Sequence, residues 1–125
     1  MSKLVKRTRR RKLLQREENA PIIPSTYEVS KALYNTPMYK AWREAVFIRD
    51  EYTCQMCGRK GALEAHHIRT KKLFPELTLD ETNGITLCKH CHQKLVTGKE
   101  DRFAYIFSRV VRLNIQRQKL KEERP

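Results

Sequence analysis

The chain has 125 residues, 27 of them Lys or Arg and 14 Asp or Glu, which gives a formal net charge of +13. This length predicts a single domain, and the charge indicates a polyanionic partner such as DNA rather than an acidic small molecule. No apolar run is long enough to cross a bilayer and no apolar stretch follows the basic N-terminus, so we expect a soluble, cytoplasmic protein with no membrane partner.

Residues 1–24 are predicted to be a basic, flexible arm and linker, because their positive charges would repel one another in a packed element. The arm offers three arginines as candidate DNA contacts, namely Arg9, Arg10 and Arg11. A solvated tail that aids solubility is the alternative. Pro21 and Pro24 favour an extended linker, since proline restricts its own backbone and that of the residue before it.

Two helices are expected before the first cysteine. Ser25 and Glu28 have the spacing of a capping box, which predicts a short helix ending near Asn35. Thr36 followed by Pro37 then predicts the N-cap and first residue of a second helix.

The second helix carries apolar residues at helical spacing: Met38, Trp42, Ala45 and Val46. This pattern predicts that one face of the helix packs against the rest of the domain. Trp42 is therefore expected in the core, and a base-stacking platform is the alternative.

All four cysteines lie in two C-x-x-C pairs about thirty residues apart, at Cys54, Cys57, Cys88 and Cys91. Four thiolates in such pairs are the ligand set of a closed tetrahedral zinc site. Two disulfides are the alternative, but no export signal supports an oxidising compartment. We therefore predict a structural zinc whose loss unfolds the domain.

Between the cysteine pairs, residues 63–68 and 85–87 are predicted to be short strands joined by a charged loop over 69–82. Three basic residues of this loop are candidate phosphate contacts, namely Arg69, Lys71 and Lys72. A solvated loop is the alternative.

After the second pair, a short helix is predicted from Cys91 to about Val96, where Gly98 stops it. Asp101 is the expected N-cap of a last helix that reaches Arg117 or beyond.

The last helix carries an apolar stripe made of Phe103, Ile106, Phe107, Val110 and Leu113. We expect this stripe to pack within the chain, with packing against a second copy as the alternative, so the protein is expected to be a monomer. Residues 118–125 are predicted to be a polar tail that frays.

Four further polar residues lie within the cysteine-bearing segment: His66 and His67 on the first strand, Asn83 before the second, and His92 directly after the last cysteine. Neighbouring side chains of a strand point to opposite faces, so the two adjacent histidines should not bind the same ion. Polar strand residues without an ion, a replacement of one cysteine ligand by His92, and ordinary turn chemistry at Asn83 are the alternatives. His90 has no expected role and should be exposed.

Over residues 36–97, these residues together resemble the signature of the HNH endonucleases. The resemblance implies an α+β fold, namely a small zinc-stabilised ββα-metal (His-Me finger) core with flanking helices. It also implies that residues 25–117 form the nuclease domain, with helices at both ends.

By the same resemblance, His67 is the general base, and His66 and His92 hold a catalytic divalent metal, which would be Mg²⁺, Mn²⁺, Ni²⁺ or Zn²⁺. Asn83 would pin the loop between the strands. The sequence departs from members that carry a further metal-binding histidine one helical turn after the last motif residue, because that position is Val96.

The implied activity is that of a metal-dependent DNA endonuclease, either nicking or double-strand cutting, that leaves a 5′-phosphate and a 3′-hydroxyl. Similarity to small phage-encoded HNH nucleases suggests DNA packaging or processing beside terminase subunits, in the cytoplasm of the host cell. The alternative is a non-catalytic, zinc-stabilised DNA-binding module.

Overall fold

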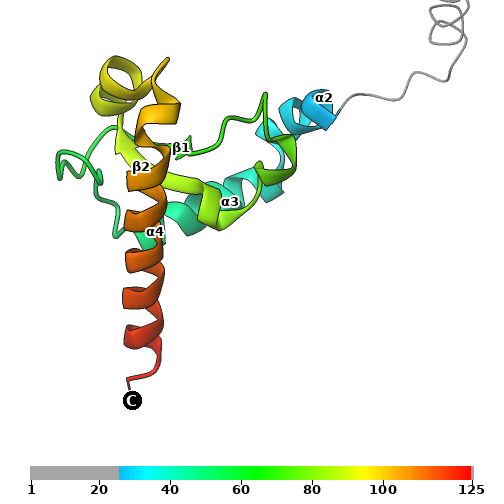
Figure 1. Ribbon diagram of the computed structural model, residues 1–125. Helices are drawn as coiled ribbons and strands as arrows, with labels where there is room; N and C mark the ends of the chain where they lie inside the picture. The colour runs from blue at the N-terminus through cyan, green and yellow to red at the C-terminus, as the bar shows by residue number, and fades with distance from the viewer. Residues whose placement is uncertain (1–25, 125) are drawn as a thin grey trace, which may run out of the picture.

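The computed structural model describes residues 26–124 of the chain. The basic arm with Arg9, Arg10 and Arg11, and the capping residue Ser25, lie outside the described residues. The main elements are α2 (Thr26–Ala32), α3 (Pro37–Arg49), β1 (Leu63–His67), β2 (Gly84–Cys88) and α4 (Glu100–Glu122), shown in Figure 1. Short helical turns join them: η1 (Leu33–Asn35), η2 (Pro75–Leu77), η3 (Glu81–Asn83) and the π-helix η4 (Cys91–Val96).

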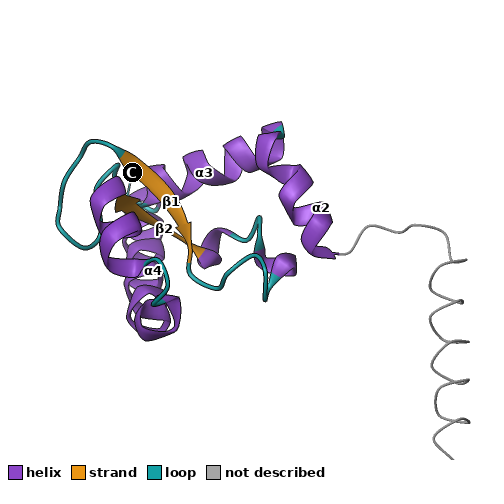
Figure 2. Ribbon diagram, turned by 90° about the horizontal axis from the view of Figure 1, so that it is seen from above, coloured by secondary structure: helices purple, strands orange, loops and turns teal. Residues whose placement is uncertain are grey.

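The two strands form an antiparallel sheet that lies between α3 and α4, as Figure 2 shows. The register pairs Leu63 with Cys88 at one end and His67 with Gly84 at the other. This is the ββα-metal arrangement expected from the sequence, an α+β fold. No helix of the described part of the chain is long and apolar enough to cross a membrane.

Helix α3 begins as predicted, since the Thr36 side chain accepts a hydrogen bond from the Tyr39 N–H at 3.3 Å. Trp42 and Val46 are buried on its inner face, which confirms the core position of Trp42. Met38 is 58% exposed, so its predicted core position is wrong, and Tyr39 takes that place beside Trp42. The aromatic ring of Tyr39 fills more of the space above the sheet than the narrow methionine side chain would.

A glycine at the start of β2 lets α3 approach the sheet closely. A Cβ atom at Gly84 would lie 2.6 Å from Val46 and 2.7 Å from Trp42. Any larger residue would push α3 away from the sheet, and with it the side chain of Trp42.

Helix α4 differs from its sequence prediction at its start and in the face that it buries. It begins at Glu100 with Lys99 at the N-cap position, so Asp101 is a first-turn residue and not the cap. The buried residues are Ala104, Phe107, Val111 and Asn114, whereas the predicted stripe members Ile106 and Leu113 are 58% and 62% exposed. Apolar residues cover two adjacent faces of this helix, and periodicity alone did not select the face that meets the sheet.

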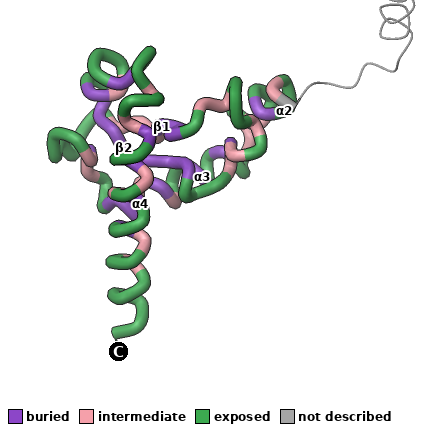
Figure 3. Tube along the Cα trace, in the orientation of Figure 1, coloured by how far each residue is buried: buried purple, intermediate pink, exposed green. Residues whose placement is uncertain are grey.

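The helix also runs past Arg117 to Glu122. Figures 1 and 3 show that its second half projects from the domain with most of its surface exposed.

A buried ion pair joins α3 to the sheet and to α4. The guanidinium of Arg49 makes two 2.9 Å hydrogen bonds to Asp50 and one of 2.6 Å to the Gly84 carbonyl. The Asp50 carboxylate also accepts from the Thr86 N–H and from the Asn114 side chain, each at 2.9 Å. Removing either charge would leave the other one buried without an opposite charge beside it. The free-energy cost of this is far larger than the contribution of the intact pair to stability.

Candidate metal centres and cleft

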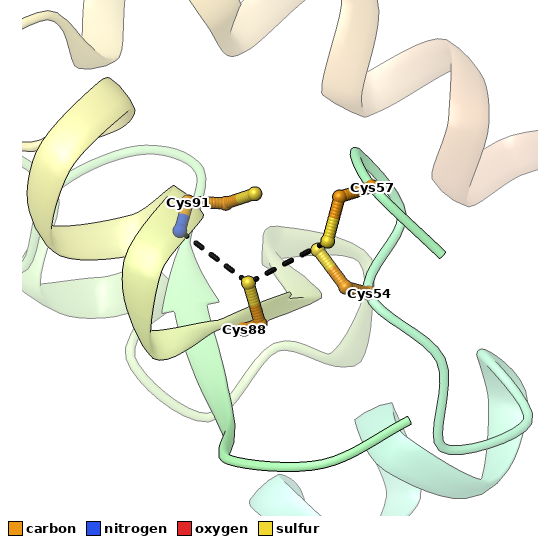
Figure 4. A group of neighbouring side chains, drawn as sticks. All are labelled: Cys54, Cys57, Cys88 and Cys91. Atoms are coloured by element: carbon orange, nitrogen blue, oxygen red, sulfur yellow. Dashed lines mark hydrogen bonds between the residues drawn. The ribbon is translucent and has the colours of Figure 1, made fainter. Parts of the chain in front are cut away.

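The four cysteines meet at one point although two of them precede the sheet, one ends β2 and one follows it (Figure 4). All four sulfur atoms lie within 4.8 Å of one another, and the sulfurs of Cys57 and Cys88 are 3.6 Å apart. A tetrahedral zinc with bonds of about 2.3 Å separates its sulfur ligands by about 3.8 Å. The four thiols are free of disulfides, so the cluster fits a structural zinc as predicted.

Backbone N–H groups around the sulfurs favour the thiolate form that a metal needs. Burial raises the pKa of Cys54, but hydrogen bonds from the backbone of Cys57, Cys88 and Met56 outweigh it and lower that pKa to about 7. The N–H of Cys91 points at the Cys88 sulfur at 3.4 Å and lowers the pKa of Cys88. These donors are also suited to sharing the negative charge of metal-bound sulfur.

The cysteine cluster is part of the main hydrophobic core. Cys54, Cys88 and Cys91 are buried together with Ile85 and Leu87 of β2 and with the inner face of α4. The cluster thus joins the turn after α3, the end of β2 and the start of η4, and a zinc held there would stabilise the packing of all three.

The histidine pair of β1 divides between the two faces of the sheet, as strand alternation predicts. The His67 ring stacks on Trp42 of α3, with centroids 4.3 Å apart and planes inclined by 10°. The His66 ring faces the other way, with centroids 5.8 Å from Phe107 of α4 and 5.0 Å from His92.

One ring nitrogen of His67 is held by a backbone carbonyl that the sequence could not identify. Its Nε2 lies 2.9 Å from the carbonyl oxygen of Thr78, which can only accept, so Nε2 carries the proton and Nδ1 has the free electron pair. The pKa of His67 is lowered to about 4, chiefly by burial and also by the positive charge of Lys71, against the opposing effect of the Thr78 carbonyl. The ring is therefore a neutral proton acceptor at pH 7.

Asn83 fastens both ends of the loop that carries Thr78. Its side-chain oxygen accepts from the Arg69 N–H at 2.8 Å, and its side-chain nitrogen donates to the carbonyls of Arg69 at 3.0 Å and Leu77 at 3.2 Å. The side chain is buried and contacts backbone groups, which is the contact pattern that the resemblance implied for it. The Trp42 indole adds a 2.8 Å hydrogen bond to the carbonyl of Asp80 in the same loop.

His66 has a buried nitrogen with no partner. The residue is 5% exposed, and its Nε2 is the one buried side-chain polar atom of the described residues that makes no hydrogen bond. Burial lowers the pKa of His66 to about 4, with smaller contributions from His92 and His67 and an opposing one from Glu100. A buried polar atom without a partner costs free energy, and coordination of a cation by this neutral ring would remove that cost.

His92 is oriented by a carboxylate that the sequence analysis did not single out. Its Nδ1 lies 2.5 Å from Glu64 Oε2, and the other Glu64 oxygen accepts from Gln93 at 3.2 Å. A carboxylate on one ring nitrogen is the usual support of a metal-binding histidine, since it directs the second nitrogen at the ion. Glu64 precedes His66 by two positions in β1, so strand alternation was the signal that could have identified it.

A cleft of about 190 Å³ brings these groups together. Its lining includes His66, His67, His92 and Lys71, and also Tyr34, Tyr39, Ala65, Thr70 and Glu100. The ammonium of Lys71 lies 4.1 Å from the centre of the Tyr34 ring, and burial lowers its pKa. The neutral imidazole of His67, the ammonium of Lys71 and the imidazole of His66, which has a buried nitrogen without a partner, thus belong to residues that line one cleft.

The remaining candidates lie at the surface. Arg69 and Lys72 are exposed in the loop after β1, and neither lines the cleft, while His90 is exposed as expected. A larger hollow of about 530 Å³ follows the outer face of α4, but its lining contains no histidine, cysteine or carboxylate. Three of the four histidines of the chain therefore line the smaller cleft.

Residues 54–97 match a family model described as HNH endonuclease. The match covers both cysteine pairs, the strand with the two histidines, Asn83 and His92, and it indicates a nuclease or DNA-binding activity for this segment. No match was found among the curated proteins or among the solved structures.

Proposed function

We propose that the protein is a metal-dependent DNA endonuclease in which His67 is the general base. The observation that carries the proposal is the pairing of His67 Nε2 with the Thr78 carbonyl, which leaves Nδ1 free in the cleft that also holds the partnerless nitrogen of His66. A base needs a free nitrogen, a fixed ring and a neutral state, and His67 meets all three conditions.

In the reaction, Nδ1 of His67 accepts a proton from a water molecule as the water oxygen attacks phosphorus. The bond from phosphorus to the 3′ oxygen breaks, and this oxygen takes up a proton from a solvent water molecule, which leaves a 5′-phosphate and a 3′-hydroxyl. Stacking on Trp42 and the hydrogen bond to Thr78 hold the imidazole plane during the transfer, so little reorganisation is required.

His66 and His92 would hold the catalytic cation, and Glu64 would fix the orientation of His92. When bound, a divalent cation there neutralises charge on the phosphoryl oxygens and stabilises the departing oxygen. Lys71 in the cleft and the net charge of +13 favour binding of the DNA backbone. Arg69 and Lys72 are candidates for flanking phosphates.

The test is cleavage of a supercoiled plasmid by zinc-loaded protein with each divalent ion in turn. His67→Ala is expected to lower the cleavage rate by about 10² to 10⁴, the usual contribution of a general base. His90→Ala is the matched control, because it removes an exposed histidine from the same domain.

Two results would contradict the proposal. Cleavage by His67→Ala at the wild-type rate would remove the base assignment. Binding of DNA without cleavage under every ion would instead identify a zinc-stabilised DNA-binding module.

A further inference from the structure

The cleft contains a carboxylate that has no part in the proposed cleavage mechanism. Glu100, the first residue of α4, is the single acidic residue in its lining, beside His66, His67 and His92. It lies close enough to act electrostatically on His66. The second carboxylate nearby, on Glu64, is already bound to His92.

Two imidazoles alone are a sparse ligand set for a divalent cation. The residue one turn beyond His92 cannot add a third ligand, because Val96 is apolar and fully buried in the core. Magnesium and manganese prefer oxygen ligands, above all carboxylates. The cleft therefore needs an oxygen from another element if such an ion is to bind there before DNA does.

The turn between η4 and α4 brings Glu100 back to the cleft. Gly98 has a φ of +83°, a conformation that favours glycine, and its N–H donates to Glu100 Oε1 at 3.1 Å. Within the described residues, Glu100 Oε2 makes no hydrogen bond. The carboxylate thus accepts a hydrogen bond at one oxygen and has none at the other, in a cleft lining that it shares with His66 and His92.

We propose that Glu100 is the third protein ligand of the cation held by His66 and His92, so that two imidazoles and one carboxylate can bind a divalent cation such as Mn²⁺ without DNA. This inference rests on the proposed function of the same cleft. In the described chain the four cysteines are the one group of three or more potential ligands already close enough to share an ion. Glu100 must therefore rotate into the cleft when the cation binds, a movement open to a side chain on the first turn of a helix.

The experiment measures Mn²⁺ binding by calorimetry to zinc-loaded, full-length protein without DNA. Glu100→Gln is expected to weaken Mn²⁺ binding at least about tenfold, since loss of a direct ligand should cost no less than loss of a residue that supports one. Asp101→Asn is the matched control, because it removes the same charge from the same helical turn at an exposed position outside the cleft. Far-UV circular dichroism and zinc content verify that each variant is folded.

Glu100→His provides a second readout, which is a change in metal preference and not a loss of Mn²⁺ affinity. Three imidazoles favour Ni²⁺ and Zn²⁺ over Mn²⁺, so the ratio of Ni²⁺ to Mn²⁺ affinity should rise at least about tenfold if Glu100 coordinates the ion. An unchanged ratio would overturn the ligand role.

His66→Ala separates this inference from the proposed function. If His66→Ala abolishes Mn²⁺ binding while Glu100→Gln leaves it unchanged, the Glu100 ligand is excluded and the two-histidine site stands. If Asp101→Asn weakens binding as much as Glu100→Gln, the effect is general electrostatics and the inference is overturned. If His66→Ala leaves binding unchanged, the metal site of the proposed function fails, and the role of Glu100 fails with it.

Discussion

The cysteine cluster and the histidine cleft share the same two strands and the turn that carries Cys91 and His92, yet they are built differently. The cysteines form a complete ligand set, mostly buried in the core and held by backbone N–H groups. The histidines form an incomplete one along the lining of a cleft, in which His67 faces α3 and His66 faces α4. The first arrangement suits an ion that stays, and the second suits an ion and a phosphate that exchange.

The difference shows how a small domain can keep an open site. The cleft depends on a loop over residues 69–82 that is fixed largely by hydrogen bonds, above all from the Asn83 side chain. A zinc at the cysteine cluster would supply the stability that such a loop cannot. The two regions should therefore respond to mutation in distinct ways.

The largest effect is expected at the cysteine cluster. Cys88→Ser, or removal of zinc by a chelator, should unfold the domain, because structural zinc binding is worth about 10–16 kcal/mol and small domains are stable by only about 5–15 kcal/mol. Far-UV circular dichroism measures the loss of folded structure, and metal analysis measures the loss of zinc. His90→Ser, at an exposed position within the same knuckle, should leave both unchanged, and a folded, zinc-free Cys88→Ser would contradict the comparison.

The next largest effect is expected at the buried ion pair that joins α3 to the sheet and to α4. Arg49→Met should lower the free energy of unfolding by about 3–5 kcal/mol, because it leaves the buried Asp50 carboxylate without its partner. Urea unfolding followed by Trp42 fluorescence measures it. Arg43→Met, an exposed position on the same helix, is the control. Equal stability of the two variants would show that the pair does not couple α3 to the sheet.

A smaller effect, confined to the cleft, is expected for Glu64→Gln. Loss of the carboxylate that orients His92 should weaken Mn²⁺ binding by about 10- to 100-fold while zinc content stays the same. Calorimetry with zinc-loaded protein measures the affinity, and Glu76→Gln in the exposed loop is the control. A loss of zinc in Glu64→Gln would mean that the two regions are not independent.

The smallest effect is expected at the surface. Lys72→Ala should reduce the slope of log affinity against log salt for DNA by about one, as the loss of one phosphate contact does. Titration of labelled duplex DNA at several salt concentrations measures the slope. Lys119→Ala, near the projecting end of α4, should leave the slope unchanged if DNA binding centres on the cleft.

Much of the site could be predicted because it depends on local spacing. The two C-x-x-C pairs predicted a four-cysteine cluster, and the alternation of side chains along a strand separated His66 from His67. The predicted helix start at Thr36 was also correct, because capping depends on neighbours in the chain. The catalytic roles of His67, Asn83 and His92 stay predictions until the proposed variants are measured.

Other features could not be read from neighbours in the chain. The buried face of α4 was predicted only in part: Phe103, Phe107 and Val110 pack on the core, whereas Ile106 and Leu113 are exposed. Apolar residues continue onto the neighbouring face of this helix, and only contact with the sheet selects which of them are buried. The hydrogen-bond network of Arg49, Asp50 and Asn114 joins residues that are far apart in the sequence, so no local pattern predicts it.

The sequence by itself determined which residues can bind metal, because ligand chemistry and the spacing of short turns are local properties. Tertiary structure decided which of them work together: it set the Thr78 carbonyl against His67, Glu64 against His92 and Glu100 at the mouth of the cleft. These pairings depend on where loops and helices return to the sheet. The positions of these loops and helices against the sheet are set by packing over the whole domain, and no single segment determines them.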